Sequence, residues 1–314
     1  MAIEETTSPA THSGLLQELL EATSRTFALA IPLLPHPTRA EATIAYLLFR
    51  IADTFEDATV LWDRDRRIAA LGELAEALAA SDPRERASRL AREWSDHPPI
   101  DHPGYLHLLE HTPVVVSALQ GLEGAARDAI KRHTIRTAEG MAGFVARTDA
   151  DGILRLEDLA ALRDYCYVVA GIVGEMLTEL FVLSNPGLTA IADELHPRAA
   201  TFGEGLQLTN ILKDAAGDHH EGRNFVPPAV DRGELFALAR RDLEAAEEYC
   251  LVLQRAGAPS GIVAFTSLTV GLAWPTLRKV EAHGPGSKIS RARVHLVQQR
   301  IRRAIAAGRP VFDR

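Results

Sequence analysis

The sequence predicts an all-α protein, and three observations support this prediction. Strong helix formers, chiefly Ala, Leu, Glu and Arg, dominate the 314-residue chain. Apolar residues recur at helical spacing, whereas no stretch shows the alternating pattern of a half-buried strand. The hydrophobic content of 46% is ample for a large core. We therefore expect a single helical domain over residues 14–314, preceded by a flexible tail over residues 1–13.

The composition also excludes several classes of function. A net charge of −8 provides no basic surface for nucleic acid. With only two cysteines, a disulfide scaffold and a cysteine-based zinc site are excluded, and a reducing compartment fits. The first residues lack the features of a signal peptide, and no uninterrupted apolar run of about 18 residues predicts a membrane span. We expect a cytoplasmic protein, and peripheral contact with a membrane stays open.

The N-terminal part predicts two helices joined by a polar turn. An amphipathic helix begins near Ser13, and its end reads Thr23-Ser24-Arg25-Thr26-Phe27. Hydroxyl groups beside an arginine can hold phosphate oxygens, which makes Ser24 and Arg25 candidates for substrate binding. The alternative is that Ser24 only caps the next helix.

A long helix is expected from about residue 37 to residue 58. Tyr46, Arg50, Asp53 and Asp57 follow one another at steps of four, three and four residues, so they share one face. Two carboxylates one turn apart repel each other, which indicates that a cation lies between them. Oxygen ligands suit a hard ion such as Mg²⁺. The alternative is a solvated acidic face.

The middle of the chain carries no comparable pattern. A charged helix follows Asp63, and the proline-rich residues 81–104 predict loops. His107 and His111, one helical turn apart, can ligate zinc, but no third ligand is apparent from the sequence. Another helix is expected over about residues 113–147.

A very apolar helix begins near residue 156 and contains Tyr165, Gly171 and Gly174. Each glycine weakens a helix by about 1 kcal/mol. The glycines therefore indicate either close packing of two helices or room for a bulky apolar ligand. Tyr165 is either a residue of a ligand cavity or a core tyrosine with a satisfied hydroxyl.

The next helix carries a second acidic face. Asn210, Asp214 and Asp218 recur at four-residue steps, and leucines at other positions can pack. Two such acidic pairs on separate apolar helices are far less expected by chance than one. The second pair therefore strengthens the prediction of metal binding at both.

The C-terminal part predicts three helices. Two of them span about residues 232–256 and 260–283, and the third begins near Ile289 after a flexible turn. Lys288, Arg291 and Arg293 can close over an anion or form a solvated helix face.

Paired acidic helices with arginines nearby suit one chemical task. Metal ions held by the carboxylates would grip a diphosphate and help it to leave as an anion. The carbocation left behind would need a dry pocket with aromatic faces. Because the chain is acidic, an anionic substrate would need metal ions as a bridge.

Four motifs, in order along the chain, resemble those of the squalene/phytoene synthase family, the head-to-head prenyl synthases. They lie at residues 23–27, 46–57, 165–174 and 207–227. The resemblance covers most of the chain, from about Ser24 to Arg293. It implies an isoprenoid-synthase-type helical bundle around a central cavity, in which Mg²⁺ bridges prenyl diphosphates.

The resemblance also implies roles for single residues. The acidic motifs and the tyrosine of the cation chemistry correspond to Asp53, Asp57, Asp214, Asp218 and Tyr165, with Asn210 as a further metal ligand. Substrate contacts correspond to Ser24, Arg25, Phe27, Tyr46, Arg50, Gln207, Asn210, Lys213 and Arg223. Lys213 stands where the family usually has arginine, which keeps the charge but loses the bidentate fork. Lys288, Arg291 and Arg293 match a basic segment that squalene synthases use near NADPH.

Within the family, residues 53–57 and 223–227 look most like squalene synthase. We therefore expect Mg²⁺-dependent condensation of two farnesyl diphosphates through presqualene diphosphate, followed by NADPH reduction to squalene. Residues 265–270 lack the proline-glutamine element of eukaryotic squalene synthases, and their C-terminal membrane anchor is not found. The alternative is therefore a phytoene, dehydrosqualene or presqualene diphosphate synthase without the reductive step. A more distant alternative is a non-catalytic helical scaffold that binds metal. The sequence does not set the prenyl chain length or the oligomeric state.

Overall fold

The computed structural model describes residues 9–149, 152–220 and 223–312, except for the side chains of residues 9–12 and 218–220. Helices make up nearly all of the regular structure in these ranges, which confirms the all-α prediction. The described strands, β1 (Leu154–Arg155) and β2 (Arg223–Asn224), are two residues long and pair in parallel.

The helices fall before and after β1 in the chain. Those before it are α1 (Pro9–Thr23), α2 (Phe27–Ala30), the 3₁₀ turn η1 (Ile31–Leu33), α3 (Thr38–Glu56), α4 (Arg64–Ala79), α5 (Pro83–Asp96), α6 (Pro103–Glu110), α7 (Thr112–Gln120) and α8 (Gly124–Val145). Those after it are α9 (Leu159–Cys166), the π-helical turn η2 (Tyr167–Gly171), α10 (Ile172–Ser184), the 3₁₀ turn η3 (Pro186–Ile191), α11 (Ala192–His220), α12 (Arg232–Arg255), α13 (Ser260–His283) and α14 (Arg291–Ala306).

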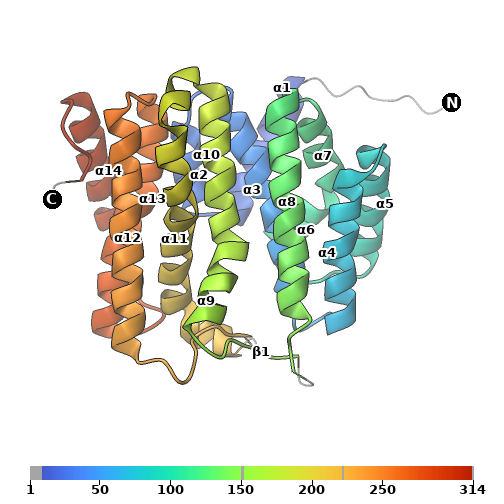
Figure 1. Cartoon of the computed structure of the whole chain (residues 1–314). Coiled ribbons are helices and arrows are strands. Elements are labelled where there is room, and N and C mark those ends of the chain that lie inside the picture. Colours follow the sequence, from blue (N-terminus) through green and yellow to red (C-terminus); the bar gives the residue numbers. More distant parts are fainter. Residues whose placement is uncertain (1–8, 150–151, 221–222, 313–314) are drawn as a thin grey trace.

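The long helices run side by side in two groups (Figure 1). In one group α8 packs against α3 and α4, and in the other α11 packs against α10, α12 and α13. Contacts of α10 with α3 and α8 join the two groups. At the lower end of the view in Figure 1, β1, the start of α9 and the segment after α11 lie together.

Three expected boundaries are wrong, each for a local reason. α1 begins at Pro9, so the expected tail includes helical residues 9–13. The expected loops over 81–104 contain α5, because Pro83 occupies the first turn and Asp82 accepts a hydrogen bond from the Glu85 amide at 3.0 Å. The helix expected over 113–147 is two helices, α7 and α8, which are interrupted at residues 121–123.

Close approach of two backbones explains the glycines of the apolar helix. A Cβ atom on Gly174 would lie 2.0 Å from the carbonyl oxygen of Ala199 in α11. A Cβ atom on Gly203 of α11 would lie 2.0 Å from the carbonyl oxygen of Ala170. Of the two interpretations of these glycines, the structure therefore supports close helix packing.

The substitution Gly174→Ala is expected to destabilise the protein by about 1–3 kcal/mol or more, because α10 and α11 must move apart. Gly72→Ala in α4 is the matched control, since a Cβ there meets nothing within 4 Å. The control should stabilise its helix by up to about 1 kcal/mol. Urea unfolding of both variants measures the difference, and equal effects would contradict the packing argument.

Two helical segments are long and apolar enough to cross a membrane, although we expected none. They are Leu159–Ser184, with mean hydropathy 1.8, and Ser260–His283, with mean hydropathy 1.3. Half of the first window and 61% of the second are buried inside the bundle. Because core helices of helical bundles pass the same test, these segments are weak evidence for a membrane span.

Candidate active site

Hydrogen bonds and ring contacts hold the polar turn at residues 23–27 against α3. The Phe27 amide donates a hydrogen bond of 2.9 Å to the Ser24 hydroxyl, so Ser24 satisfies the first amide of α2, although the N-cap position itself is Thr26. The Tyr46 hydroxyl donates to the Thr23 carbonyl at 2.8 Å, and the rings of Phe27 and Tyr46 lie 5.5 Å apart. Arg25 is exposed. The structure thus brings the first motif against the second.

Arg50 lies at the centre of the first acidic face. Its guanidinium pairs with Asp53 at 3.2 Å and donates to the Tyr46 hydroxyl at 3.2 Å. The rings of Tyr46 and of Tyr105, from α6, each lie 5.6 Å from the guanidinium carbon. Tyr105 could not be predicted from the sequence, because it stands in a segment with no periodic polar pattern.

Asp57 and Arg223 connect two motifs that are distant in sequence. The Asp57 carboxylate accepts a hydrogen bond of 2.6 Å from the Arg223 guanidinium. Pairing of β2 with β1 holds Arg223 in place, since Leu154 lies opposite it in the register. The first acidic motif and the segment that follows the second motif therefore meet at one end of the bundle.

Tyr165 is buried between this acidic cluster and two aromatic rings. Its ring stacks on Phe225 at 4.5 Å and meets the edge of Phe144 at 5.1 Å. Its hydroxyl is close enough to Glu56, a buried carboxylate at the end of α3, to oppose the rise in the pKa of that carboxyl. One oxygen of Glu56 has no hydrogen-bond partner among the described residues.

Sequence reasoning missed three members of this cluster. Glu56 and Phe225 lie within motifs at residues 46–57 and 207–227, but neither was assigned a role in the site. Arg67, whose guanidinium donates to the Glu56 carbonyl, is buried in α4. The one available signal was an acidic residue among apolar neighbours in the last turn of α3.

Burial and crowding shift the titration of the carboxyl groups. Burial raises the pKa of Asp53 to about 6, with Arg50 opposing the shift and Asp57 adding to it. Burial, together with the charges of Asp57 and Asp53, raises the pKa of Glu56 well above its usual value. Burial and the Glu56 charge likewise raise the pKa of Tyr165, so its phenol is protonated at neutral pH.

In metal-free protein, ionisation of the Asp53 carboxyl is expected to lower the free energy of unfolding as pH rises. Between pH 3.8 and about 6 the folded state holds a proton that the unfolded state has lost, so the free energy of unfolding falls. At about 1.36 kcal/mol per pKa unit, the loss is at most about 3 kcal/mol. Asp53→Asn should therefore gain stability over the parent at pH 7 but not at pH 4. Urea unfolding in a chelator measures this, and a constant difference would contradict it.

The second acidic face lies on the exposed side of α11. Leu208, Ile211 and Leu212 are buried on its other side. Lys213 pairs with Asp214 at 3.0 Å and donates to Asn210 at 3.2 Å. Gln207 is half-buried, and the Asp218 side chain lies outside the described residues. Asp214 thus pairs within its own helix and not with a group on α3.

The late basic segment reaches this second face. The Gly286 amide donates a hydrogen bond of 2.6 Å to the Lys213 carbonyl, which holds the turn after α13 against α11. Lys288 lies in this turn, where its carbonyl accepts from Lys279 at 2.7 Å. Arg291 and Arg293 are exposed in the first turn of α14, which Ser290 caps.

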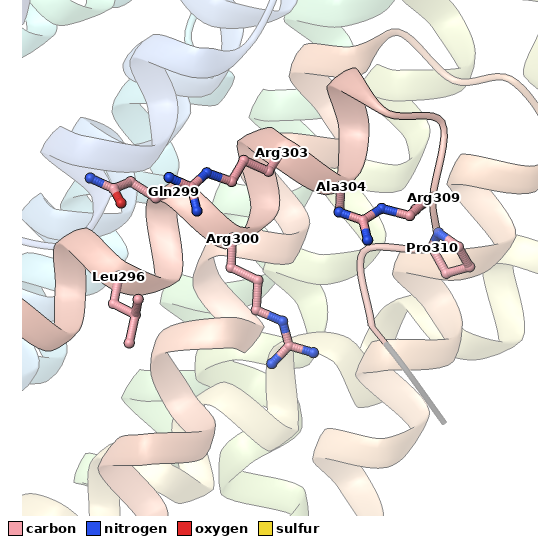
Figure 2. Close-up of a pocket in the computed structure, with 7 residues that line it drawn as sticks. All are labelled: Leu296, Gln299, Arg300, Arg303, Ala304, Arg309 and Pro310. Atoms are coloured by element: carbon pink, nitrogen blue, oxygen red, sulfur yellow. The ribbon is translucent and has the colours of Figure 1, made fainter.

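Basic side chains continue along α14 to its far end. Arg300 and Arg303, with Arg309 from the segment after the helix, line a pocket of about 420 Å³ (Figure 2). Leu296, at the rim of this pocket, is 54% exposed. None of the residues that line this pocket belongs to α3 or α11, which carry the acidic faces.

The acidic residues fit a hard divalent cation. Asp53 and Asp57 offer oxygen ligands at one end of the bundle, with Glu56 behind them and Asp214 on α11. The raised pKa of Asp53 reflects burial and the nearby Asp57 charge, and a bound cation would offset both. The exposed cations of residues 288–293 fit the phosphates of a dinucleotide by charge alone.

Comparisons with known proteins identify the family of the chain. The family model for squalene/phytoene synthase matches residues 20–231. Squalene synthase ERG9 of Gibberella zeae is 31% identical over 230 residues, which cover 71% of this chain and 45% of that protein. Squalene synthase BSS of Botryococcus braunii is 33% identical over 211 residues, which cover 66% and 41%. The chain thus matches less than half the length of these relatives.

Solved structures share the fold at lower identity. TcSQS in complex with the ligand E5700 is 24% identical, with a TM-score of 0.73 over 92% of this chain and 85% of that one. A dehydrosqualene synthase in complex with ligand is 18% identical, with a TM-score of 0.60 over 95% and 98%. With the family model matched over two-thirds of the sequence, the chain belongs to the squalene/phytoene synthase family.

Proposed function

We propose that this protein condenses two farnesyl diphosphates head to head through presqualene diphosphate, and that NADPH then reduces the product to squalene. The observation that carries the proposal is the contact of Asp57 with Arg223, next to the Glu56–Tyr165 pair. It joins anion-binding groups to a buried aromatic cluster, and the reaction needs both. The squalene synthases among the curated relatives support the choice of reaction.

The polar part of the site would bind the diphosphates. Asp53, Asp57, Asn210, Asp214 and Asp218 would hold Mg²⁺, which when bound neutralises the diphosphate and promotes its departure. Arg50, Arg223 and Lys213 lie beside these carboxylates and would contact the phosphate oxygens directly. Gln207 and Ser24, with Arg25 and Phe27, would complete the polar and apolar rim.

The aromatic part would protect the carbocation that remains. Tyr165, Phe225 and Phe144 present ring faces and edges in a buried cluster. Ring faces stabilise a cation, and apolar packing keeps water away from it. With its raised pKa, the Tyr165 hydroxyl stays protonated and can orient a departing anion or return a proton through Glu56.

NADPH, when bound, would supply a hydride to the carbocation. No Gly-rich dinucleotide fingerprint is present in the sequence to hold its phosphates. Lys288, Arg291 and Arg293 are the candidates, supported by the hydrogen bond that holds their turn against α11 at Lys213.

Product analysis tests the proposal. Purified protein is supplied with C15 or C20 diphosphate, Mg²⁺, and NADPH present or absent. Squalene is expected from the C15 substrate with NADPH, and presqualene diphosphate or species derived from it without NADPH. Identical products in both cases would replace the proposal by a dehydrosqualene or phytoene synthase. Metal binding without diphosphate release would indicate a non-catalytic scaffold.

Removal of the basic charges should separate the two steps. Lys288→Gln with Arg291→Gln is expected to raise the KM for NADPH at least about tenfold, because each lost phosphate contact costs about 1 kcal/mol or more. Formation of presqualene diphosphate should change little. Arg302→Gln with Arg303→Gln, farther along α14, is the matched control. An equal rise in the KM for NADPH in both variants would show that NADPH does not bind at residues 288–293.

We also propose a cytoplasmic location with peripheral membrane contact through α14. The exposed Leu296 and the arginines around it suit the surface of an anionic membrane. Co-sedimentation with anionic and with neutral vesicles tests this, and equal binding to both, or to neither, would contradict it.

A further inference from the structure

A histidine-rich cluster lies on α6, outside the acidic site. His107, Glu110 and His111 each offer one ligand atom, and these atoms lie within 4.8 Å of one another. Spacings of three and four residues place the three side chains on one face of the helix end. Glu110 is thus the third ligand that the pair of histidines lacked in the sequence.

The two histidines differ in what their second ring nitrogen meets, because only that of His111 makes a hydrogen bond. Nδ1 of His111 lies 2.9 Å from the His107 carbonyl oxygen, which leaves Nε2 available for a metal. Nε2 of His107 lies 3.7 Å from the Glu18 carboxylate on α1, while Nδ1 lies 4.0 Å from the Glu110 carboxylate. Metal-binding histidines characteristically donate their second ring N–H to a carboxylate or a backbone carbonyl.

The His107 ring also lacks the hydrogen bonds that would make it a purely structural residue. Nε2 is buried, and it has no hydrogen-bond partner among the described residues. The two imidazole rings lie 4.4 Å apart, so their nitrogens can approach a common point. His107 therefore has a buried ring nitrogen that makes no hydrogen bond, and the Glu18 carboxylate lies near it at 3.7 Å.

We propose that Nδ1 of His107, Nε2 of His111 and the Glu110 carboxylate bind a zinc-like transition-metal ion, and that Glu18 orients His107. In a tetrahedral zinc site the ligand atoms lie about 3.3 Å apart, so small rotations close the present gaps. Three protein ligands leave the fourth position for water. Because imidazole nitrogen favours zinc over Mg²⁺, this site differs in chemistry from the carboxylates of α3 and α11.

The position of α6 gives the site a structural consequence. Tyr105, two residues before His107, places its ring against the Arg50 guanidinium at 5.6 Å. A metal ion at the end of α6, with Glu18 behind it, would tie α6 to α1 close to the residue that contacts Arg50.

Calorimetric titration of tag-free protein with Zn²⁺, in excess Mg²⁺, tests the site. One zinc ion is expected to bind, and Co²⁺ in its place should give the visible absorption of a nitrogen-ligated ion. His111→Gln should weaken zinc binding at least about tenfold, and Glu18→Gln should weaken it about 10–100-fold. His196→Gln, an exposed histidine on α11, is the matched control and should bind as the parent does.

A second variant tests whether zinc binds instead at the carboxylates of the proposed Mg²⁺ site. Asp53→Asn should keep the zinc isotherm, which distinguishes this site from the metal site of the proposed function. Far-UV circular dichroism confirms folding, and if His111→Gln does not fold, His107→Gln takes its place. Unchanged zinc affinity in the folded histidine variants, or loss of binding in Asp53→Asn, would overturn the proposal.

Discussion

Turnover is expected to fall by about two to four orders of magnitude when Asp53 or Asp214 is replaced by asparagine. The substitution keeps the shape of the side chain but removes a negatively charged ligand, and metal stabilisation of a leaving diphosphate is worth several kcal/mol. Diphosphate release measured against Mg²⁺ concentration gives the result. The loss should appear mainly as a lower kcat and a higher Mg²⁺ concentration for half-maximal turnover. The KM for the prenyl diphosphate should change less, because apolar contacts with the prenyl chain remain.

Asp65→Asn is the matched control for this prediction. Asp65 is an exposed aspartate in the first turn of α4, paired only with the adjacent Arg64 at 3.3 Å among the described contacts. Its loss should leave turnover unchanged. Asp53→Asn is expected to be at least as stable as the parent at pH 7, and thermal unfolding of the same preparation separates loss of activity from unfolding. Near-normal diphosphate release from folded Asp53→Asn would refute the metal bridge.

The second large effect is expected at Tyr165. Tyr165→Phe removes the hydroxyl next to Glu56 but keeps the ring between Phe225 and Phe144. If the hydroxyl takes part in proton or anion handling, product formation should fall by about 10²-fold or more, with a smaller rise in KM. Single-turnover product analysis, with thermal unfolding of the same preparation, measures both quantities.

Tyr249→Phe provides the comparison for Tyr165. Tyr249 is also fully buried, and its hydroxyl lies 2.7 Å from the Thr178 hydroxyl in the core. Each substitution should cost about 1–2 kcal/mol of stability by removing one buried hydroxyl contact. Only Tyr165→Phe should change the kinetics. Similar kinetics in both variants would indicate that Tyr165 is only a packed core residue.

The sequence by itself determined the fold class and the best-formed helices. The predicted span 260–283 is α13, and the acidic faces on α3 and α11 follow from four-residue spacing. These features are local, because a helix face depends only on residues within one or two turns. The prolines of residues 81–104 misled the prediction, since a proline at a first turn starts a helix as readily as it ends one.

Only the tertiary structure decided which motifs meet. The contact of Asp57 with Arg223 spans 166 residues, and the approach of the Tyr165 hydroxyl to Glu56 likewise joins α9 to α3. Tyr105 faces Arg50 because α6 packs against α3, which no pattern within α6 reveals. The same packing sets burial, and burial raises the pKa of Asp53 to about 6. Spacing determines which side chains share a helix face. The residues that meet this face, and how deeply it is buried, depend on how separate helices pack together.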